Sequence, residues 1–199
     1  MAEVTVYADY VCPYCLLAEQ SLLAAIGERD ISIRWRAFEL RPDPVPTLRP
    51  EDDYLQTVWR QSVYPMAKQM GVPIQLPTLS PQPRTDKAFE LLAMAEDQGL
   101  AHAYSMRLLR AFFQEDRDIG QVNVLVELAA EVGLDPAAAR QALEQGIYTA
   151  RHQEALRHAR EERVITSVPT LVIGEQVFQG VPSVAKLQQA IALLDEALD

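Results

Sequence analysis

The stretch Asp9-Tyr10-Val11-Cys12-Pro13-Tyr14-Cys15-Leu16-Leu17 (DYVCPYCLL) decides the fold, and it contains both cysteines of the 199-residue chain. Residues 3–8, directly before it, are rich in β-branched and aromatic side chains, which predicts a short buried strand. After it, apolar residues follow the helical period as far as Gly27, a suitable helix C-cap. Cysteines between a strand and a helix leave three interpretations open: a redox-active dithiol, half of a metal site, or two small core residues.

The first strand and helix are followed by a second strand. Residues 31–38 (ISIRWRAF) alternate between apolar and charged side chains, as a half-buried strand does. A strand, a helix and a strand in this order predict a right-handed crossover between two parallel strands.

The middle of the chain changes composition. Nine of the 13 prolines fall between Pro42 and Pro83, on both sides of a helical segment at about residues 54–70. Because proline interrupts helices and central strands, we interpret these stretches as connectors that reverse the chain. From Thr85 to about Glu162 the pattern is helical throughout, with a capping residue and proline at Asp135-Pro136.

A strand pattern returns near the C-terminus. Residues 170–173 (TLVI) and 177–178 (VF) flank Gly174-Glu175, which predicts a β-hairpin. Ser183 then caps a final amphipathic helix. The chain therefore has the order βαβ, a helical block, then ββα, which is an α/β fold with an all-helical insertion.

The overall composition excludes several classes of protein. Hydrophobic residues make up 49% and charged residues 23%, as in folded globular domains, and the formal net charge is −10. A chain this acidic repels the phosphates of nucleic acids, so we expect no nucleic-acid partner. No apolar run approaches the roughly 20 residues that span a bilayer, and no secretory signal begins the sequence. We therefore expect a cytoplasmic protein without a membrane partner and without a persistent structural disulfide.

The two cysteines have distinct expected roles. With Cys12 as the N-cap and Pro13 as the first helical residue, the unpaired N–H groups and partial positive charge of the helix N-terminus favour a thiolate at Cys12. Cys15 lies one turn further on and deeper. We predict that Cys12 attacks a disulfide and that Cys15 resolves the mixed disulfide.

The competing interpretations of these cysteines are weaker. A structural zinc site needs about four ligands, and the chain has no second cysteine pair. His102, His152 and His158 are scattered along helical segments, where we expect solvated or packed side chains. We therefore favour a redox dithiol and predict no metal site.

A second motif lies far along the chain. Residues 166–171 (TSVPTL) place Pro169 at the start of a strand, directly after the β-branched Val168. A cis peptide bond can occur at such a position. The motif becomes informative together with an N-terminal CxxC and the βαβ…ββα order of elements.

With these motifs the sequence resembles the thioredoxin superfamily, specifically its DsbA-like branch. It is most similar to the FrnE-like proteins, which are related to 2-hydroxychromene-2-carboxylate isomerase and kappa-class glutathione transferase. The resemblance covers essentially the whole chain and is carried by residues 9–15 (DYVCPYC), 113–119 (FQEDRDI), 129–135 (AAEVGLD) and 164–173 (VITSVPTLVI). It implies a discontinuous thioredoxin-like domain of residues 1–45 and 160–199, interrupted by a helical insertion domain of residues 46–159.

The resemblance also implies roles for individual residues. Cys12 is implied as the nucleophile and Cys15 as the resolving thiol, with Pro169 as the cis-proline that faces them. The Val168 backbone is implied to contact the bound peptide or thiol, and Pro13 and Tyr14 complete the expected substrate-binding set. No resident cofactor is implied, and glutathione is left open as a co-substrate.

The chain departs from the pattern of these families at two places. Many relatives have a buried carboxylate six residues before the nucleophile, where this chain has Val6. Asp9 is a candidate replacement, but its position at the loop end of a strand predicts a solvated capping residue. Arg84-Thr85 stands where the FrnE-like and isomerase branches usually have asparagine before threonine.

Three functions follow from these observations. The leading hypothesis is a thiol–disulfide oxidoreductase acting on proteins or small thiols, as a monomer or homodimer. The alternative is a glutathione-dependent isomerase or transferase of the 2-hydroxychromene-2-carboxylate or kappa type. The third is a redox sensor or partner-binding module. Tyr10, Tyr14, Trp59 and Phe112 are candidates for a substrate groove, and we expect Trp59 and Phe112 in the core.

Overall fold

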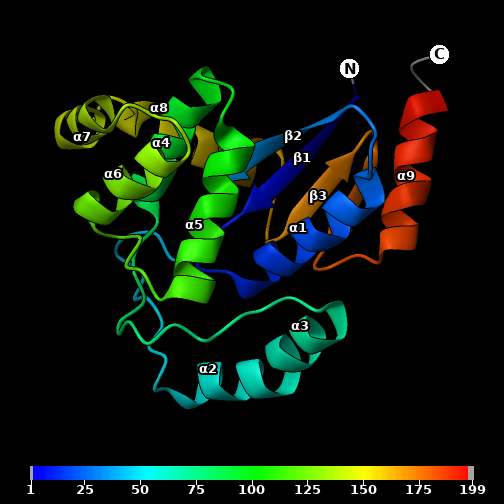
Figure 1. Cartoon of the computed structure of the whole chain (residues 1–199), viewed down its shortest axis with the longest axis horizontal. Helices are drawn as coiled ribbons and strands as arrows, with labels where there is room; N and C mark the ends of the chain where they lie inside the picture. Colours follow the sequence, from blue (N-terminus) through cyan, green and yellow to red (C-terminus); the bar gives the residue numbers. More distant parts are fainter. Residues whose placement is uncertain (1, 197–199) are drawn as a thin grey trace.

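A central sheet organises the molecule, and the computed structural model describes residues 2–196 (Figure 1). The sheet has the strand order β2-β1-β3-β4. The strands are β1 (Ala2–Ala8), β2 (Ile31–Ala37), β3 (Thr170–Ile173) and β4 (Gln176–Gln179). β1 runs parallel to β2 and antiparallel to β3, and β3 and β4 form a hairpin. The predicted parallel pair and hairpin are both confirmed.

Most of the remaining described residues are helical, and the order of the elements confirms the predicted βαβ, helical block and ββα. The helices are α1 (Pro13–Ile26), α2 (Asp53–Val58), the π-helical η1 (Trp59–Val63), α3 (Tyr64–Met70), α4 (Asp86–Asp97), α5 (Ala101–Glu115), α6 (Val122–Glu131), α7 (Pro136–Gln145), α8 (Thr149–Arg157), the π-helical η2 (His158–Glu162) and α9 (Val184–Glu196).

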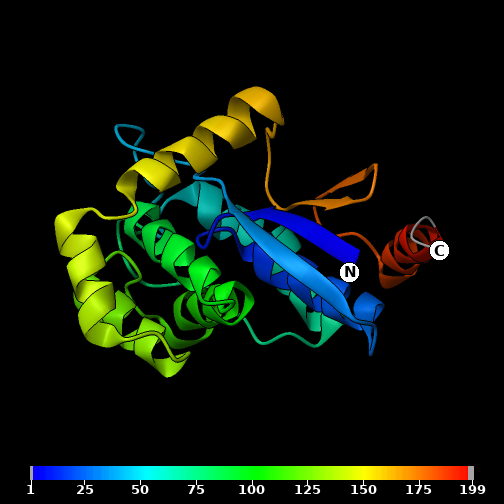
Figure 2. The same cartoon turned by 90° about the horizontal axis from the view of Figure 1, so that it is seen from above.

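The two faces of the sheet are covered by different helices. Successive side chains of a strand point to opposite faces of the sheet. On one face, Val4 and Val6 of β1 belong to the main core, together with residues of α1 and α9. Tyr7 faces the other way and forms a small cluster with Phe38, Ala159 and Ile165, under η2. Figure 2 shows α8 on the side of the sheet opposite α1.

Helix α1 forms where the sequence predicts it. Cys12 is its N-cap with extended backbone angles (φ −94°, ψ 112°), Pro13 opens the first turn, and Gly27 ends the helix with a positive φ of 59°. Leu16, Leu17 and Leu22 are fully buried, and each such side chain stabilises the fold by about 1.5–3 kcal/mol. The start of α1 is therefore anchored to the core and holds the cysteines in place.

The helical block contains two connectors that matter for the site. The first connector (residues 39–52) leads from β2 to the continuous run of α2, η1 and α3, and the second connector (residues 71–84) leads on to α4. The α2–α3 run lies below α1 and α5 in Figure 1. At the C-terminal end of the block, η2 (His158–Glu162) spans residue 160, which is the predicted start of the second segment of the thioredoxin-like domain. The domain boundaries stay a prediction.

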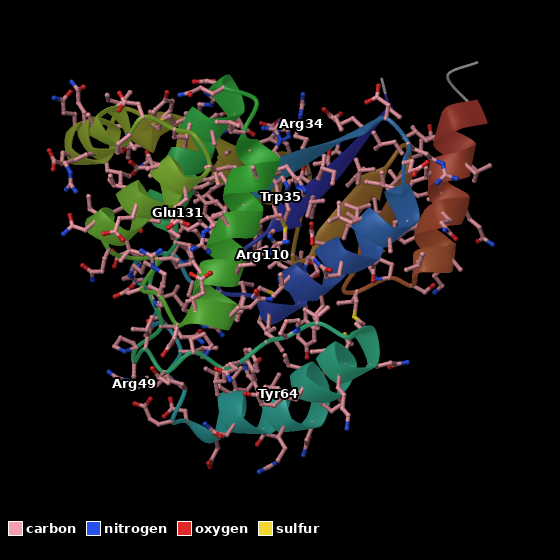
Figure 3. All side chains as sticks on the ribbon, viewed as in Figure 1. Arg34, Trp35, Arg49, Tyr64, Arg110 and Glu131 are labelled. Atoms are coloured by element: carbon pink, nitrogen blue, oxygen red, sulfur yellow. The ribbon has the colours of Figure 1, made fainter. Side chains whose placement is uncertain are left out.

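Ion pairs tie together the outer helices of the block. Glu131 of α6 lies beside α5 (Figure 3), where it accepts hydrogen bonds from Arg107 and Arg117. Such exposed pairs are worth about 0–1 kcal/mol each, so the apolar core carries most of the stability. In the described part of the chain, no helix has both the length and the apolar character needed to cross a membrane.

Candidate active site

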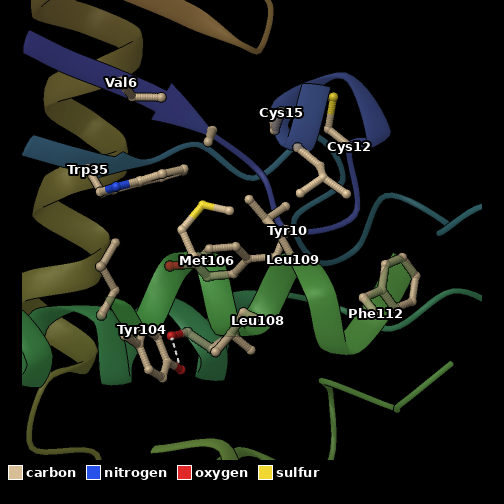
Figure 4. Packing of buried hydrophobic residues seen from close by; sticks show 14 of the residues in the cluster. Val6, Tyr10, Cys12, Cys15, Trp35, Tyr104, Met106, Leu108, Leu109 and Phe112 are labelled. Carbon is tan, nitrogen blue, oxygen red and sulfur yellow. Dashed lines mark hydrogen bonds between the residues drawn. The ribbon is translucent and has the colours of Figure 1, made fainter. Parts of the chain in front are cut away.

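The two cysteines occupy the first turn of α1. Both are unpaired thiols, and their side chains are buried, with 5% of Cys12 and 1% of Cys15 exposed. Figure 4 shows them on one turn at the start of the helix, with the Cys12 sulfur pointing away from Leu109. The N-cap position of Cys12 and the deeper position of Cys15 agree with the sequence-based prediction.

The segment before β3 faces Cys12. The Cys12 thiol donates a hydrogen bond to the Val168 carbonyl oxygen, with an Sγ–O distance of 3.6 Å. The Val168–Pro169 peptide bond is cis. The Thr170 hydroxyl donates to the Ser167 carbonyl at 2.7 Å, and the Gly180 N–H donates to the Pro169 carbonyl at 2.9 Å. These bonds hold the Val168 carbonyl against the thiol although 156 positions separate the two residues.

A pocket of about 190 Å³ opens beside Cys12. Its walls come from the start of α1, both connectors, the α2–η1 run and Val168. The Gln82 N–H donates to the Leu48 carbonyl at 2.7 Å, which joins the two connectors, and the Tyr14 hydroxyl donates to Ser62 Oγ at 2.6 Å, which joins α1 to η1. The pocket therefore depends on contacts between segments far apart in the sequence.

Asp9 is buried next to this pocket, so the prediction of a solvated capping residue is wrong. Its side chain is 1% exposed and lines the pocket. Carboxylate oxygen Oδ2 accepts a hydrogen bond from the Leu40 N–H at 2.8 Å. The first connector folds over the end of β1 and excludes water from Asp9, which the strand pattern alone does not reveal.

Burial changes the acidity of two groups here. It raises the pKa of Asp9 to about 6, against the opposing effects of the Leu40 N–H and the Thr85 hydroxyl, and the negative Glu39 raises it further. Burial also raises the pKa of the Cys15 thiol well above its ordinary value. Cys12 and the charge of Asp9 raise the Cys15 pKa further, whereas the Asp9 backbone N–H lowers it. The site thus holds a buried thiol and a weakly acidic carboxyl group that influence each other.

The fold agrees with what comparison with known proteins shows. The model of the DSBA-like thioredoxin domain matches residues 3–192. The chain belongs to the DsbA-like thioredoxin domain family. The protein YwbO of Bacillus subtilis (strain 168), itself described as uncharacterized, is 43% identical over 191 residues, which are 96% of each chain. The family resemblance predicted from the sequence is confirmed.

Several solved structures share the fold. A probable DsbA oxidoreductase, SCO1869 of Streptomyces coelicolor, has a TM-score of 0.78 at 21% identity and covers 98% of this chain and 91% of its own. A 2-hydroxychromene-2-carboxylate isomerase has a TM-score of 0.78 at 20% identity, with 99% of both chains covered. The cytosolic disulfide reductase DsbM of Pseudomonas aeruginosa has a TM-score of 0.68 at 21% identity, with 98% of both chains covered. Another structure of DsbM contains GSH.

In this DsbA-like chain the predicted site residues occupy different places around the pocket. Cys12, Pro13, Tyr14 and Val168 are among its lining residues. Neither Cys15, which lies behind Cys12, nor Pro169 belongs to the lining among the described residues. Their functional roles remain predictions.

The aromatic candidates for a substrate groove lie partly in the core and partly on the pocket wall. Trp59 and Phe112 are 1% and 0% exposed, and Tyr10 is fully buried, so the expected core positions of Trp59 and Phe112 are confirmed. Trp59 also lines the pocket, as does the exposed Tyr54 of α2. Trp59 therefore belongs to both the core and the pocket wall.

The sequence pattern did not identify the pocket residues of the connectors. Arg41, Leu48 and Gln82 line the pocket, together with Arg84 and Thr85. Only Arg84 and Thr85 stood out in the sequence, because they replace a residue pair of related families. The proline-rich connectors, which were interpreted as chain reversals, form walls of the pocket. A wall made of irregular chain has no sequence periodicity by which it could be predicted.

The histidines have separate environments. His102 accepts a hydrogen bond from the Trp35 indole at 3.0 Å, and His152 pairs with Glu39 at 2.5 Å. His158 pairs with Glu162 on the protein surface. Residues 2–196 contain no group of three or more His, Cys, Asp or Glu side chains arranged to hold a metal ion.

Proposed function

We propose that this protein is a thiol–disulfide oxidoreductase in which Cys12 attacks and Cys15 resolves. The observation that carries the proposal is the pair of free thiols in the first turn of α1, with Cys12 on the pocket and Cys15 behind it. Cys12 attacks a substrate disulfide, and one substrate thiolate leaves. Cys15 then attacks Cys12, releases the second substrate thiolate and closes the Cys12–Cys15 disulfide. The substrate gains two electrons and the protein dithiol loses two.

The geometry supports this division of roles. A helix N-terminus carries a partial positive charge that stabilises a thiolate, and Cys12 is the residue at that terminus. The Val168 carbonyl beside Cys12 offers a backbone acceptor at the place where a substrate chain would lie. The DsbA-like family and the fold shared with the disulfide reductase DsbM support the same chemistry.

The pocket supports substrates that combine an apolar part with a polar part. Leu48, Leu55 and Trp59 provide apolar walls, and Arg41 provides a cationic group. We propose disulfides of proteins or of small molecules as substrates, with Pro13, Tyr14 and Val168 in contact with them.

The proposal is tested by reduction of insulin disulfides with dithiothreitol as the electron donor. Cys12→Ser is expected to reduce the rate to the uncatalysed background. Cys15→Ser, mixed with insulin in the absence of dithiothreitol, is expected to trap a mixed disulfide at Cys12 that mass spectrometry detects. The exposed Ala24→Ser variant, on the same helix, is the control and is expected to match the wild type. Equal rates for the wild type and Cys12→Ser would refute the proposal.

A glutathione-dependent isomerase or transferase is the second candidate. It is supported by the small pocket beside Cys12, which is lined by the exposed Tyr54 and the half-buried Arg41. The fold shared with an isomerase and with DsbM, for which a GSH-containing structure exists, supports it as well. Such a reaction uses one activated thiol and leaves Cys15 without a chemical role. Cys15→Ser decides between the two, because it is expected to abolish dithiol exchange and to preserve a glutathione-dependent isomerisation.

We further propose the cytoplasm as the compartment, which the description of DsbM as a cytosolic disulfide reductase supports. The direction of exchange follows from the reduction potential of the Cys12–Cys15 couple. A value near about −270 mV marks a reductant and one near about −120 mV an oxidant. Sedimentation of the purified protein distinguishes the monomer from the homodimer.

A further inference from the structure

The charged groups around the pocket beside Cys12 are mostly cationic, although the chain as a whole is acidic. The formal net charge is −10. Among the described residues that line the pocket, however, the charged ones are Arg41, Arg84 and the buried Asp9. Cations therefore outnumber anions at this place in the molecule. A cleft lined by one sign of charge raises the local concentration of ligands of the opposite sign, which here are anions.

The two arginines are used in different ways. The Arg84 guanidinium is occupied by the first connector, since its Nη1 donates to the carbonyl oxygens of Arg41 at 2.9 Å and of Val45 at 3.0 Å. Its Nη2 lies 3.4 Å from Asp43 Oδ1. The Arg41 side chain is half-buried, and its guanidinium has no hydrogen-bond or ion-pair partner within residues 2–196. Arg41 is therefore the cation that is left for a ligand.

The backbone around Arg41 is fixed on both sides. The preceding residue, Leu40, donates its N–H to Asp9 Oδ2 at 2.8 Å, and the Arg41 carbonyl accepts from Arg84. These two bonds tie the segment to the end of β1 on one side and to the second connector on the other. A side chain on a fixed backbone has less freedom to lose when it binds a ligand, which favours affinity.

The second connector, which carries Arg84, is itself held in place. Its Gln82 N–H donates to the Leu48 carbonyl at 2.7 Å, so the two connectors are joined a second time. A Cβ added at Gly120 would lie only 2.9 Å from the Pro83 Cβ, because the turn before α6 packs closely against this connector. Arg84 therefore reaches the first connector from a segment that is anchored by its own contacts.

We propose that the pocket selects small-molecule disulfides that carry an anionic group, that Arg41 contacts this group, and that Arg84 is the positioning residue for Arg41. The inference rests on the proposed thiol–disulfide exchange and names a substrate class for it. A pocket of about 190 Å³ has room for one half of a small disulfide. Its sulfur lies at Cys12, its anionic group at Arg41, and its apolar part against Leu48 and Trp59, which all line the pocket.

A matched series of three disulfides tests the charge preference. Dithiodipropionate carries two carboxylates, hydroxyethyl disulfide is neutral, and cystamine carries two ammonium groups, on chains of similar length. Each oxidises the Cys12–Cys15 dithiol to a disulfide and is itself reduced to two thiols. The rate is measured as the loss of reduced protein, by acid quenching and mass spectrometry. Division by the rate of mercaptoethanol with the same disulfide removes differences in intrinsic reactivity.

The wild type is expected to prefer the anion. After this correction, dithiodipropionate should react roughly 10-fold faster than cystamine, which is the lower range for a hydrogen bond to a charged group, with hydroxyethyl disulfide between them. The net charge of −10 by itself predicts the opposite order, because an acidic protein attracts a dication. The sign of the preference therefore separates recognition in the pocket from the charge of the whole protein.

Substitutions then assign the preference to the two arginines. Arg41→Gln is expected to lose it. Arg84→Lys keeps the charge but not the planar group that bridges two carbonyls, and it is expected to weaken the preference by roughly threefold, as for one lost neutral hydrogen bond. The control is Arg49→Gln. Arg49 is an exposed residue of the same connector (Figure 3) that is not among the described lining residues, and its replacement should keep the wild-type preference.

Three results would overturn the inference. A wild type that reacts with dithiodipropionate no faster than with cystamine would disprove the selection, and this result needs no variant that might fold poorly. An unchanged preference in Arg41→Gln would disprove the contact, and an unchanged preference in Arg84→Lys would disprove the positioning role. Failure of the proposed function is distinct, because then none of the three disulfides oxidises the dithiol and insulin is not reduced.

Discussion

Replacement of Asp9 by asparagine is expected to stabilise the protein near neutral pH. Burial raises the pKa of Asp9 from 3.8 to about 6, so the ionised carboxylate is less favourable in the folded protein than in water. Each pKa unit corresponds to 1.36 kcal/mol, and ionisation of Asp9 therefore costs the fold about 3 kcal/mol. Asparagine keeps a carbonyl oxygen for the Leu40 N–H and carries no charge.

The sign of the pH dependence follows from the raised pKa. The neutral acid favours the folded state, so its contribution is fully present below pH 3.8 and is lost as the pH rises through about 6. Asparagine does not titrate. The free-energy difference between Asp9→Asn and the wild type should therefore grow with pH, by about 2 kcal/mol of the full 3 between pH 4.5 and pH 7.5.

The measurement is urea denaturation of both proteins across this pH range, with the thiols kept reduced. Asp30→Asn serves as the control, because Asp30 is exposed and its replacement should leave a difference that is flat with pH. A difference for Asp9→Asn that stays constant from pH 4.5 to pH 7.5, or that decreases, would refute the reasoning that burial makes this carboxyl a weak acid.

Three further substitutions test the surroundings of the site. Tyr10→Phe removes the buried hydrogen bond to Ser105 Oγ (2.9 Å) and is expected to cost about 1–2 kcal/mol in thermal denaturation; no loss would show that the pair is dispensable. Phe112→Ala empties a fully buried site and is expected to cost about 3–5 kcal/mol in urea denaturation, against little change for the exposed Leu193→Ala. Glu19→Gln is expected to raise the melting temperature at pH 8.5 but not at pH 5, because burial raises the Glu19 pKa to about 7; an equal shift at both pH values would contradict this.

The sequence alone determined the order of elements and the position of the thiols. The strand pattern before Cys12, the proline after it and the helical period up to Gly27 are local signals, and the structure confirms each one. The parallel pairing of β1 with β2 also follows from the sequence, since a strand–helix–strand unit allows few arrangements. These features depend on residues within a few turns of each other.

The tertiary structure alone decided what surrounds the thiols. Val168 reaches Cys12 from the far end of the chain, and the connectors enclose Asp9, which the strand pattern predicted to be solvated. Burial and the charge of Glu39 then set the acidity of Asp9. Acidity depends on water exclusion and on charges brought close in space, and neither quantity has a period or spacing along the chain. The sequence thus places the two thiols, and only folding determines which groups lie close to them.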